Sequence, residues 1–411
     1  MRPPARPKQA FWAVVAAHFF SSLADNALLI VAMALLLERH APAWMVPALR
    51  VFFYAPYVLL AAYAGALADA LPKGRVILAT NVFKLAGCGL LLAQVHPLVA
   101  YAFIGLGAAP YSSAKYGILP ELLPPAELVR ANAWMEISNV VSIVLGVVLG
   151  GLLAGTSASI LQWASTPGLN AVVLSSLFYG LALACAAVIS ATPASNLLAM
   201  RHPQRLFGDF KRATAALWRD HDSQISLAVT SVFWAAAAVL QFIVLRWAES
   251  VLQLPLSKAA LLQAAVATGM VAGALAASRW VPMGRVLKLL PSGLLMSALL
   301  VLMLLVTQVW VAVVLLVAIG TLAGLLLVPM NALLQQRGQQ LMHPGQSVAV
   351  QNFHETLASL LLLAVYGGLT QAKVSLSWSI AGLAVFVCMA VGLIMLKKRA
   401  NQQGTSLLNP G

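Results

Sequence analysis

The chain of 411 residues is 61% hydrophobic and only 9% charged. This composition excludes an ordinary water-soluble domain and predicts an integral membrane protein. The net charge of +14 does not indicate nucleic-acid binding, because the basic residues are spread over many short loops instead of forming one patch. An outer-membrane barrel is excluded as well, since the short alternating segments of such barrels are absent.

Apolar runs of about 20 residues predict helices that cross the membrane. Twelve runs of this kind lie at about 11–37, 47–68, 76–95, 97–113, 132–154, 169–191, 225–248, 258–278, 286–307, 309–330, 350–370 and 376–396. The longest polar interruption separates two sets of six. The sequence therefore predicts an all-α membrane protein with twelve transmembrane helices in two pseudo-symmetric bundles. Its expected parts are an N-terminal bundle (1–191), a cytoplasmic linker (192–224), a C-terminal bundle (225–399) and a cytoplasmic tail (400–411).

The first run is interrupted at its centre by Asp25 and Asn26. A carboxylate in the middle of a membrane helix costs roughly 2.5 to 3.5 kcal/mol, so it usually faces a bundle interior, a partner or a polar path. At about 1.5 Å per residue, Asp25 lies about 20 Å from the cytoplasmic start of its helix. We therefore expect this protein to move a substrate past Asp25.

The distribution of Lys and Arg predicts the orientation of the chain. If the N-terminus is cytoplasmic, the opposite side carries only Arg39, Lys258 and Lys373. Such an asymmetry favours cytoplasmic positions for both termini. Residues 201–222, which include many of the basic residues, are expected either to lie on anionic lipid as an amphipathic helix or to form a solvated linker.

An internal repeat supports two related halves. Residues 65–68 (GALA) recur at 273–276, and residues 125–129 ahead of Asn132 have a counterpart at 344–348 ahead of Asn352. Parallel repeats of this type place a substrate site between the halves, and transport follows from rocking of one half against the other.

Two sets of motifs resemble a known family. Residues 65–75 (GALADALPKGR) resemble the loop between helices 2 and 3 of the major facilitator superfamily, in which Asp69 caps or pairs across the cytoplasmic face and Arg75 lies at the inner lipid surface. Residues 24–29, 111–122, 331–338 and 349–352 are similar to the bacterial lysophospholipid transporter family of that superfamily.

The second resemblance covers essentially the whole chain. It implies that lysophosphatidylethanolamine and lysophosphatidylglycerol are flipped across the bacterial inner membrane to the cytoplasmic leaflet, where an acyltransferase partner re-acylates them. It implies no cofactor. Membrane lipids and the lysophospholipid substrate are the other expected partners.

Five polar residues are candidates for the transport path. They are Asp25, Asn26, Arg50, Gln241 and Arg246. Counted along their helices, the two arginines fall near outer ends, where each either meets Asp25 or a lipid phosphate or extends to the interface. In the family that the chain resembles, a basic residue stands at the position of Gln241. The ammonium of an ethanolamine headgroup is expected to meet Asp25.

A second set of polar residues is expected at the cytoplasmic side. Counting places Lys84, Lys115, Glu136 and Glu355 toward the inner ends of their helices. Opposite charges on facing helices there form a gate that opens easily, because a buried ion pair is stable only when well matched. The alternative is that these residues only orient their helices. The predicted gate also includes residues of the resembling motifs: Asp69, Arg75, Glu121, Arg337 and Asn352.

No enzyme is predicted. The sequence has no G-x-S-x-G motif and no zinc-ligand spacing, so neither a catalytic residue nor a metal site is expected. The alternative function is a proton- or sodium-coupled exporter of amphipathic drugs that uses Asp25 as its ion site. A scaffold without transport is disfavoured by the charges inside the spans.

Overall fold

The computed structural model describes residues 7–42, 44–155, 167–189, 193–200, 202–254 and 256–408. Side chains are described within these ranges except at 154, 155, 167, 256–260 and 401–408. Residues 1–6, 43, 156–166 and 190–191 of the predicted N-terminal bundle, residues 192 and 201 of the predicted linker, residue 255 of the predicted C-terminal bundle, residues 409–411 of the predicted tail and the side chain of Lys258 lie outside what is described. The described residues form helices joined by short turns, without a strand among them, which confirms the all-α class.

The predicted spans correspond to long apolar helices. Ten helices among the described residues are long and apolar enough to cross a membrane, or eleven when the bent pair α2 (Met45–Leu59) and α3 (Ala61–Ala70) is taken as one span. The remaining predicted span, 97–113, falls on α5 (Pro97–Gly117), a helix whose second half carries Tyr, Ser and Lys side chains. The chain is therefore a multi-pass membrane protein.

The chain divides into two compact units, and each takes a segment from the opposite half of the sequence. Unit 1 comprises residues 1–124, 138–214 and 342–353, and unit 2 comprises residues 125–137, 215–341 and 354–411. The helices α7 (Leu128–Gly155) and α14 (Pro344–Gln371) therefore each contribute their first turns to one unit and the rest to the other.

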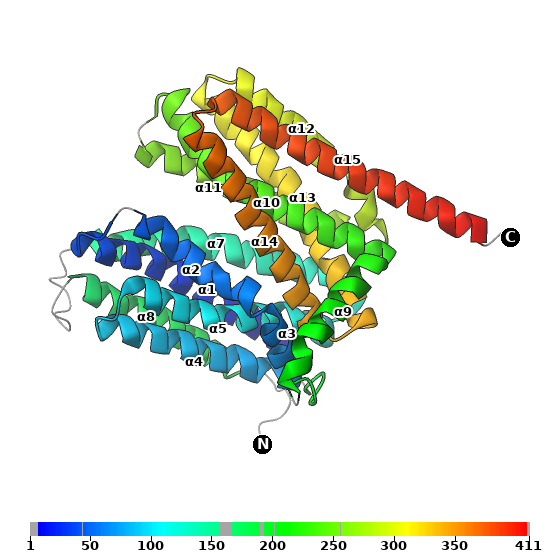
Figure 1. Cartoon of the computed structure of the whole chain (residues 1–411), viewed down its shortest axis with the longest axis horizontal. Coiled ribbons are helices and arrows are strands. Elements are labelled where there is room, and N and C mark those ends of the chain that lie inside the picture. Colours follow the sequence, from blue (N-terminus) through cyan, green and yellow to red (C-terminus); the bar gives the residue numbers. More distant parts are fainter. Residues whose placement is uncertain are drawn as a thin grey trace. The chain divides into compact units, whose positions relative to one another are not determined.

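Unit 1 is built on helices from the N-terminal half (Figure 1). They are α1 (Pro7–Glu38), α2, α3, α4 (Lys73–Leu92), α5, the short α6 (Leu119–Leu122), most of α7 and α8 (Pro167–Ala186). In this unit α1 packs on α8, while α4 packs on α5 and α8. Its core is aliphatic and includes Leu28, Ile104 and Val172.

Unit 2 is built on helices from the C-terminal half (Figure 1). They are α10 (His221–Ser250), α11 (Leu256–Trp280), α12 (Pro291–Leu302), α13 (Val309–Leu341), most of α14 and α15 (Leu376–Leu408), with short 3-10 turns at Pro125–Glu127, Met283–Leu289 and Met303–Leu305. The helix α15 thus continues through most of the segment predicted as a tail.

The second predicted span is not straight. The helices α2 and α3 meet at an angle of 65°. The bend lies at Leu60, whose backbone (φ −112°, ψ 15°) leaves the α region one turn after Pro56. The hydrogen bond from the Leu60 N–H to the Pro56 carbonyl is kept at 2.9 Å, so the bend follows from the non-helical backbone of Leu60 and not from a missing bond at the proline.

The linker contains an amphipathic helix, α9 (Leu206–Arg219), preceded by a 3-10 turn at Pro203–Arg205. Leu206, Phe210, Ala213 and Leu217 recur at helical spacing and are all buried. The ring of Phe210 packs edge-on against Phe353, with 5.5 Å between ring centroids. The apolar stripe of the linker therefore packs against protein, and the exposed residues include basic ones.

Glycines bring α11 and α13 into close contact in unit 2. A Cβ on Gly273 would collide with the carbonyl oxygen of Thr321, and a Cβ on Gly320 would collide with that of Val266. Gly269 and Gly324 have the same relation to backbone oxygens of the partner helix. Small residues four apart on both helices let the two backbones approach, which is a common packing device in membranes.

We expect Gly273→Ala to destabilise the protein by about 1 to 3 kcal/mol, because the methyl group meets a backbone oxygen that cannot move aside. Thermal unfolding of the purified protein in detergent measures this. Gly382→Ala on α15, where a Cβ would meet nothing within 4 Å, is the matched control and should not lower the melting temperature. Equal stability of the two variants would contradict the packing described here.

Candidate functional site

A buried ion pair joins α1 and α4 at the centre of unit 1. Lys84 is fully buried, and its Nζ donates to both carboxylate oxygens of Asp25, at 3.0 and 2.7 Å. The same Nζ lies 3.1 Å from Oγ of Ser21, one turn earlier on α1. The Asp25 side chain remains 18% exposed. The two charges thus neutralise each other inside an apolar bundle.

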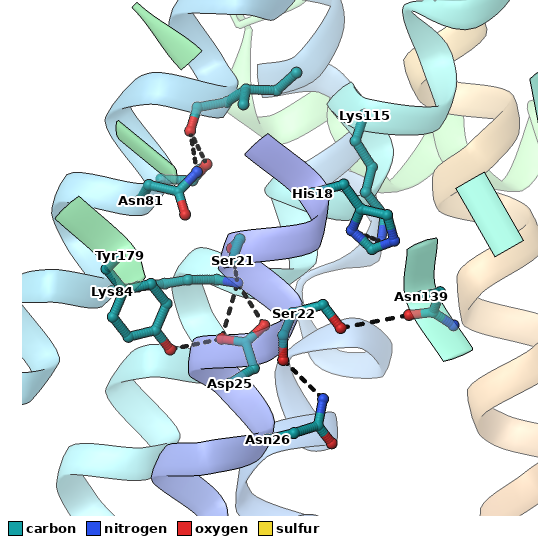
Figure 2. Close-up of polar contacts among 12 residues, drawn as sticks. His18, Ser21, Ser22, Asp25, Asn26, Asn81, Lys84, Lys115, Asn139 and Tyr179 are labelled. Atoms are coloured by element: carbon teal, nitrogen blue, oxygen red, sulfur yellow. Dashed lines mark hydrogen bonds and ion pairs between the residues drawn. The ribbon is translucent and has the colours of Figure 1, made fainter. Parts of the chain in front are cut away.

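Tyrosines from two further helices hold Asp25 in place. Tyr179 on α8 donates its hydroxyl to Oδ1 of Asp25 at 2.6 Å, and Tyr101 on α5 donates to the backbone carbonyl of Asp25 at 2.9 Å. The Lys84 ammonium lies 4.6 Å from the ring centroid of Tyr111, a cation–π distance. Figure 2 shows Lys84 and Tyr179 lying side by side and both reaching the Asp25 carboxylate. Because hydrogen bonds to both partners accompany the ion pair, the cost of burying the charges is reduced.

This arrangement corrects one inference from the sequence. Counting along each helix placed Asp25 on the outer transport path and Lys84 in the cytoplasmic gate, whereas the structure makes them direct partners. Helices do not all begin in one plane, and α4 begins at Lys73, three residues before the predicted start. A lysine side chain also extends well away from its own Cα.

Other polar residues extend the site along α1 (Figure 2). Nδ1 of His18 lies 3.3 Å from Nζ of Lys115. An ammonium can only donate, so His18 accepts at Nδ1 and carries its hydrogen at Nε2. Ser22 donates to Oδ1 of Asn139 at 3.5 Å, and Asn26 donates to the backbone carbonyl of Ser22 at 2.8 Å. The predicted residues Asp25, Asn26, Lys84 and Lys115 thus all lie within unit 1.

A second ionic cluster in unit 1 is centred on Lys73. This lysine is fully buried, and its Nζ lies 2.6 Å from Oε1 of Glu121, 3.2 Å from Oδ1 of Asp69 and 2.5 Å from Oγ of Ser195. Ser195 also donates to Glu121 at 2.6 Å. The predicted gate residues Asp69 and Glu121 are therefore joined by a lysine that the sequence did not assign to the gate.

Asp69 also binds the first turn of α14. Its two carboxylate oxygens accept the backbone N–H groups of Gly345 and Gln346, each at 2.8 Å. A carboxylate at a helix N-terminus satisfies free N–H groups and interacts favourably with the helix dipole. Further along α14, Asn352 donates to Oγ of Ser112 on α5 at 3.1 Å. These contacts attach residues 342–353 to unit 1.

In unit 2, a pair of side-chain hydrogen bonds joins α7 to α13. Asn132 on α7 and Gln335 on α13 exchange two amide hydrogen bonds, at 2.8 and 2.9 Å. Glu136, one turn after Asn132, is buried on α7, and Glu355 is half-buried on α14. Asn132 and Asn352, which the internal repeat relates, therefore each hydrogen-bond a polar residue near the end of a neighbouring helix.

Arg337 forms a surface ion-pair cluster with the start of α10. Its guanidinium lies 3.0 Å from Asp220 and 3.4 Å from Asp222. Asp220 also caps α10, accepting from the backbone N and the Oγ of Ser223 at 2.9 and 2.8 Å. Burial alone would raise the pKa of Asp220, but the bonds from Ser223 and the charge of Arg337 outweigh it. The pKa of Asp220 is therefore lowered from its ordinary value of 3.8.

The remaining predicted residues lie on α2, α4 and α10. Arg50 on α2 and Arg75 on α4 are exposed. Gln241 and Arg246 lie on α10 in unit 2, and Nη1 of Arg246 is buried with no hydrogen-bond partner among the described residues. The described residues also contain no group of three His, Cys, Asp or Glu side chains placed to hold a metal ion.

Sequence reasoning missed several members of these clusters. Lys73 follows Asp69 by four residues, a spacing that places both on one helix face and that could have indicated their ion pair. Asp220 precedes α10 with Ser223 three residues later, which is an N-cap pattern. Nothing in the sequence indicated that Tyr179 would reach Asp25, 154 residues earlier.

Comparison with known proteins places the chain in a family. The sequence profile of the Major Facilitator Superfamily matches residues 14–363. Two relatives, the lysophospholipid transporters LplT of Yersinia pestis (strain Pestoides F) and Yersinia pseudotuberculosis serotype O:3 (strain YPIII), are each 38% identical to the chain over 355 residues. The match covers 86% of this chain and 85% of each relative.

Solved structures share the architecture. The fucose:proton symporter FucP of E. coli superposes with a TM-score of 0.73 at 15% sequence identity, covering 95% of this chain and 97% of that protein. The human organic anion transporter MFSD10 gives a TM-score of 0.71 at 17% identity, covering 97% and 99% respectively. At these identities the similarity establishes the fold alone.

These results confirm the predicted fold and family. The helical architecture and the profile match define a transporter fold, and the chain belongs to the major facilitator superfamily. Within that superfamily, the identity along most of its length places it in the bacterial lysophospholipid transporter family.

We expect Lys84→Met to destabilise the protein by about 3 to 5 kcal/mol, because it leaves the Asp25 carboxylate without its cation. Asp25→Asn combined with Lys84→Met should recover much of this loss, since no unpaired charge remains. Thermal unfolding of the single and double variants in detergent forms the required comparison. A double variant no more stable than Lys84→Met alone would show that the pair is not coupled as described.

Asp220 predicts a pH-dependent contribution to stability. Because its folded-state pKa is lowered, this contribution is present above the ordinary value of 3.8 and is lost as pH falls through the lower folded value. Asp220→Asn keeps a capping side chain but removes the charge, whereas Asp220→Ala also removes the cap and costs about 0.5 to 2 kcal/mol. At neutral pH we expect the wild type to be the most stable, Asp220→Asn to be less stable and Asp220→Ala to be the least stable.

Unfolding measured between pH 7 and pH 3 tests this order. The difference between wild type and Asp220→Asn should shrink below about pH 4. A difference that stays constant over the whole range would exclude the charge of Asp220 as its cause.

Proposed function

We propose that this protein transports lysophospholipids across the bacterial inner membrane to the cytoplasmic leaflet. The main support is its similarity to proteins named lysophospholipid transporters along 86% of its length. The polar cluster around Asp25 and Lys84, on helices whose other residues are mostly apolar, is consistent with movement of a charged headgroup. The single acyl chain would stay against apolar helix surface or lipid.

The Asp25–Lys84 pair favours transport without ion coupling. An ion-coupled exporter needs a carboxylate that is free to bind a proton or a cation. Here the Asp25 carboxylate already accepts from Lys84 and Tyr179. The pair has no net charge, so it neither repels a lipid phosphate nor retains a cation. The exporter of amphipathic drugs is therefore the second choice, and Asp25 would be its ion site.

The cluster of Asp69, Lys73 and Glu121 is proposed to form a gate at the cytoplasmic side. In this cluster the carboxylate of Asp69 accepts hydrogen bonds from the backbone N–H groups of Gly345 and Gln346 at the N-terminus of α14, each at 2.8 Å. Opening requires these amides to leave Asp69, while Lys73 remains to neutralise the carboxylate. Asn352, and in unit 2 Arg337, Glu136 and Glu355, are proposed to take part in the same movement.

The proposal includes an orientation and a partner. Both termini are placed in the cytoplasm on the basis of the positive-inside rule. The transported lysolipid would then reach a cytoplasmic acyltransferase that restores its second acyl chain. The protein itself is proposed to carry out transport without chemical conversion, as the transporters of its superfamily do.

Uptake by spheroplasts that lack their own lysolipid uptake tests this function. Labelled lysophosphatidylethanolamine is supplied outside, and its conversion to diacyl lipid reports inward transfer. We expect uptake that survives an uncoupler and that falls by about tenfold in Asp25→Asn, per amount of folded protein, which corresponds to about 1.4 kcal/mol. Asp209→Asn on the exposed face of α9 is the matched control and should keep the wild-type rate.

Absence of uptake in protein shown to be inserted and folded would refute lysolipid transport. If export of a cationic dye instead appeared and collapsed with the uncoupler, the ion-coupled exporter would be the correct function.

A further inference from the structure

A polar stripe runs along one flank of α2. Arg50, Tyr54 and Tyr57 follow each other at spacings of four and three residues, so they share one helix face. The apolar residues Phe52 and Leu59 are exposed on another side of the same helix. Since α2 is part of a membrane-spanning pair, the apolar side suits lipid, and the polar stripe requires a different environment.

The tyrosines of this stripe belong to a rigid aromatic cluster. The ring centroids of Tyr54 and Tyr57 lie 5.8 Å apart with 52° between the ring planes. Phe53 packs on Tyr57 at 6.3 Å and on Tyr101 at 5.2 Å. The backbone of Phe53 lies against Gly105 on α5, where a Cβ would come within 2.5 Å of its carbonyl oxygen. The rings are therefore held by close helix contact, while Tyr54 remains 44% exposed.

The aromatic cluster adjoins the charged centre of unit 1. Phe53, which lies between Arg50 and the two tyrosines in the sequence, packs on Tyr101 with 5.2 Å between the ring centroids. Tyr101 in turn donates to the backbone carbonyl of Asp25 at 2.9 Å. The aromatic cluster that contains Tyr54 and Tyr57 therefore lies next to a residue that holds Asp25, and Arg50 shares the helix face of these tyrosines.

The Asp25 carboxylate is poorly suited to receive the ammonium of an ethanolamine headgroup. It already accepts two bonds from Lys84 and one from Tyr179. Tyr54, which is 44% exposed, and Tyr57 offer another group that attracts a cation, because an aromatic face carries partial negative charge.

We propose that Arg50, Tyr54 and Tyr57 form a receptor for a zwitterionic phosphate–ammonium headgroup. Arg50 binds the phosphate, and the faces of Tyr54 and Tyr57 receive the ammonium. Arg50 and Tyr54 are four residues apart, a rise of about 6 Å along the helix. A phosphate and an ammonium joined by two carbons fit this spacing. The inference deepens the proposed function and rests on it.

The receptor makes a prediction about headgroup preference. A glycerol headgroup offers the same phosphate but no cation, so the tyrosine faces discriminate between lysophosphatidylethanolamine and lysophosphatidylglycerol. The discrimination expected from a cation over aromatic faces is roughly 2- to 30-fold. The phosphate contact at Arg50 is common to both lipids and adds no discrimination.

Competition between these two lysolipids in the spheroplast assay tests the receptor. In the variant carrying Tyr54→Leu and Tyr57→Leu, the ratio of lysophosphatidylethanolamine to lysophosphatidylglycerol uptake should fall by roughly 2- to 30-fold. Tyr54→Phe combined with Tyr57→Phe keeps the ring faces and should retain most of the ratio. Phe52→Leu, an exposed aromatic on the apolar side of α2, is the matched control. Arg50→Gln should slow both lipids by a similar factor.

The outcomes separate this inference from the function on which it rests. If the wild type moves neither lysolipid, the proposed function fails. If it moves both, but the leucine variant folds and keeps the wild-type ratio, only the tyrosine receptor is refuted. A ratio that falls equally in the phenylalanine variant would also refute it, because the hydroxyl groups and not the ring faces would then discriminate.

Discussion

The ion pair between Asp25 and Lys84 is the interaction on which the interior of unit 1 depends. Two charges inside an apolar bundle are tolerated only when each has its partner and the remaining hydrogen-bonding atoms are satisfied. The sequence meets this condition with Ser21 on the same helix, Tyr101 on α5 and Tyr179 on α8. Four helices are thereby fixed around one polar point. At this point the pair offers a substrate polarity without net charge.

The same principle explains the clusters at the ends of the helices. Lys73 bridges the carboxylates of Asp69 and Glu121, and the free amides of α14 complete the coordination of Asp69. Since one lysine balances only one of the two carboxylates, the amides and the dipole of α14 supply the rest of the stabilisation of Asp69. Asn132 and Gln335 achieve a comparable attachment in unit 2 with neutral amides, which cost less to separate than ions.

The fold and the family could be predicted from the sequence, but the side-chain contacts within the clusters could not. Apolar runs predict spans reliably because lipid leaves the backbone no hydrogen-bond partner outside a helix. The sequence indicates a functional role for Asp25, because a single carboxylate in such a run is costly. Its partner was not identified, since Lys84 lies 59 residues away and depth along separate helices does not determine which side chains meet. The contact of Asp69 with Gly345 spans 276 residues and was equally beyond local patterns.

The central claim is that the Asp25–Lys84 pair lies on the transport path and does not merely stabilise unit 1. The most direct test reconstitutes the variant carrying both Asp25→Asn and Lys84→Met in liposomes without any ion gradient and measures the transfer of fluorescent lysophosphatidylethanolamine between leaflets. Because this variant leaves no unpaired charge, its fold can be compared with that of the wild type by thermal unfolding. The account predicts a well-folded variant that transfers the lipid at least about tenfold more slowly. Transfer at the wild-type rate would contradict it.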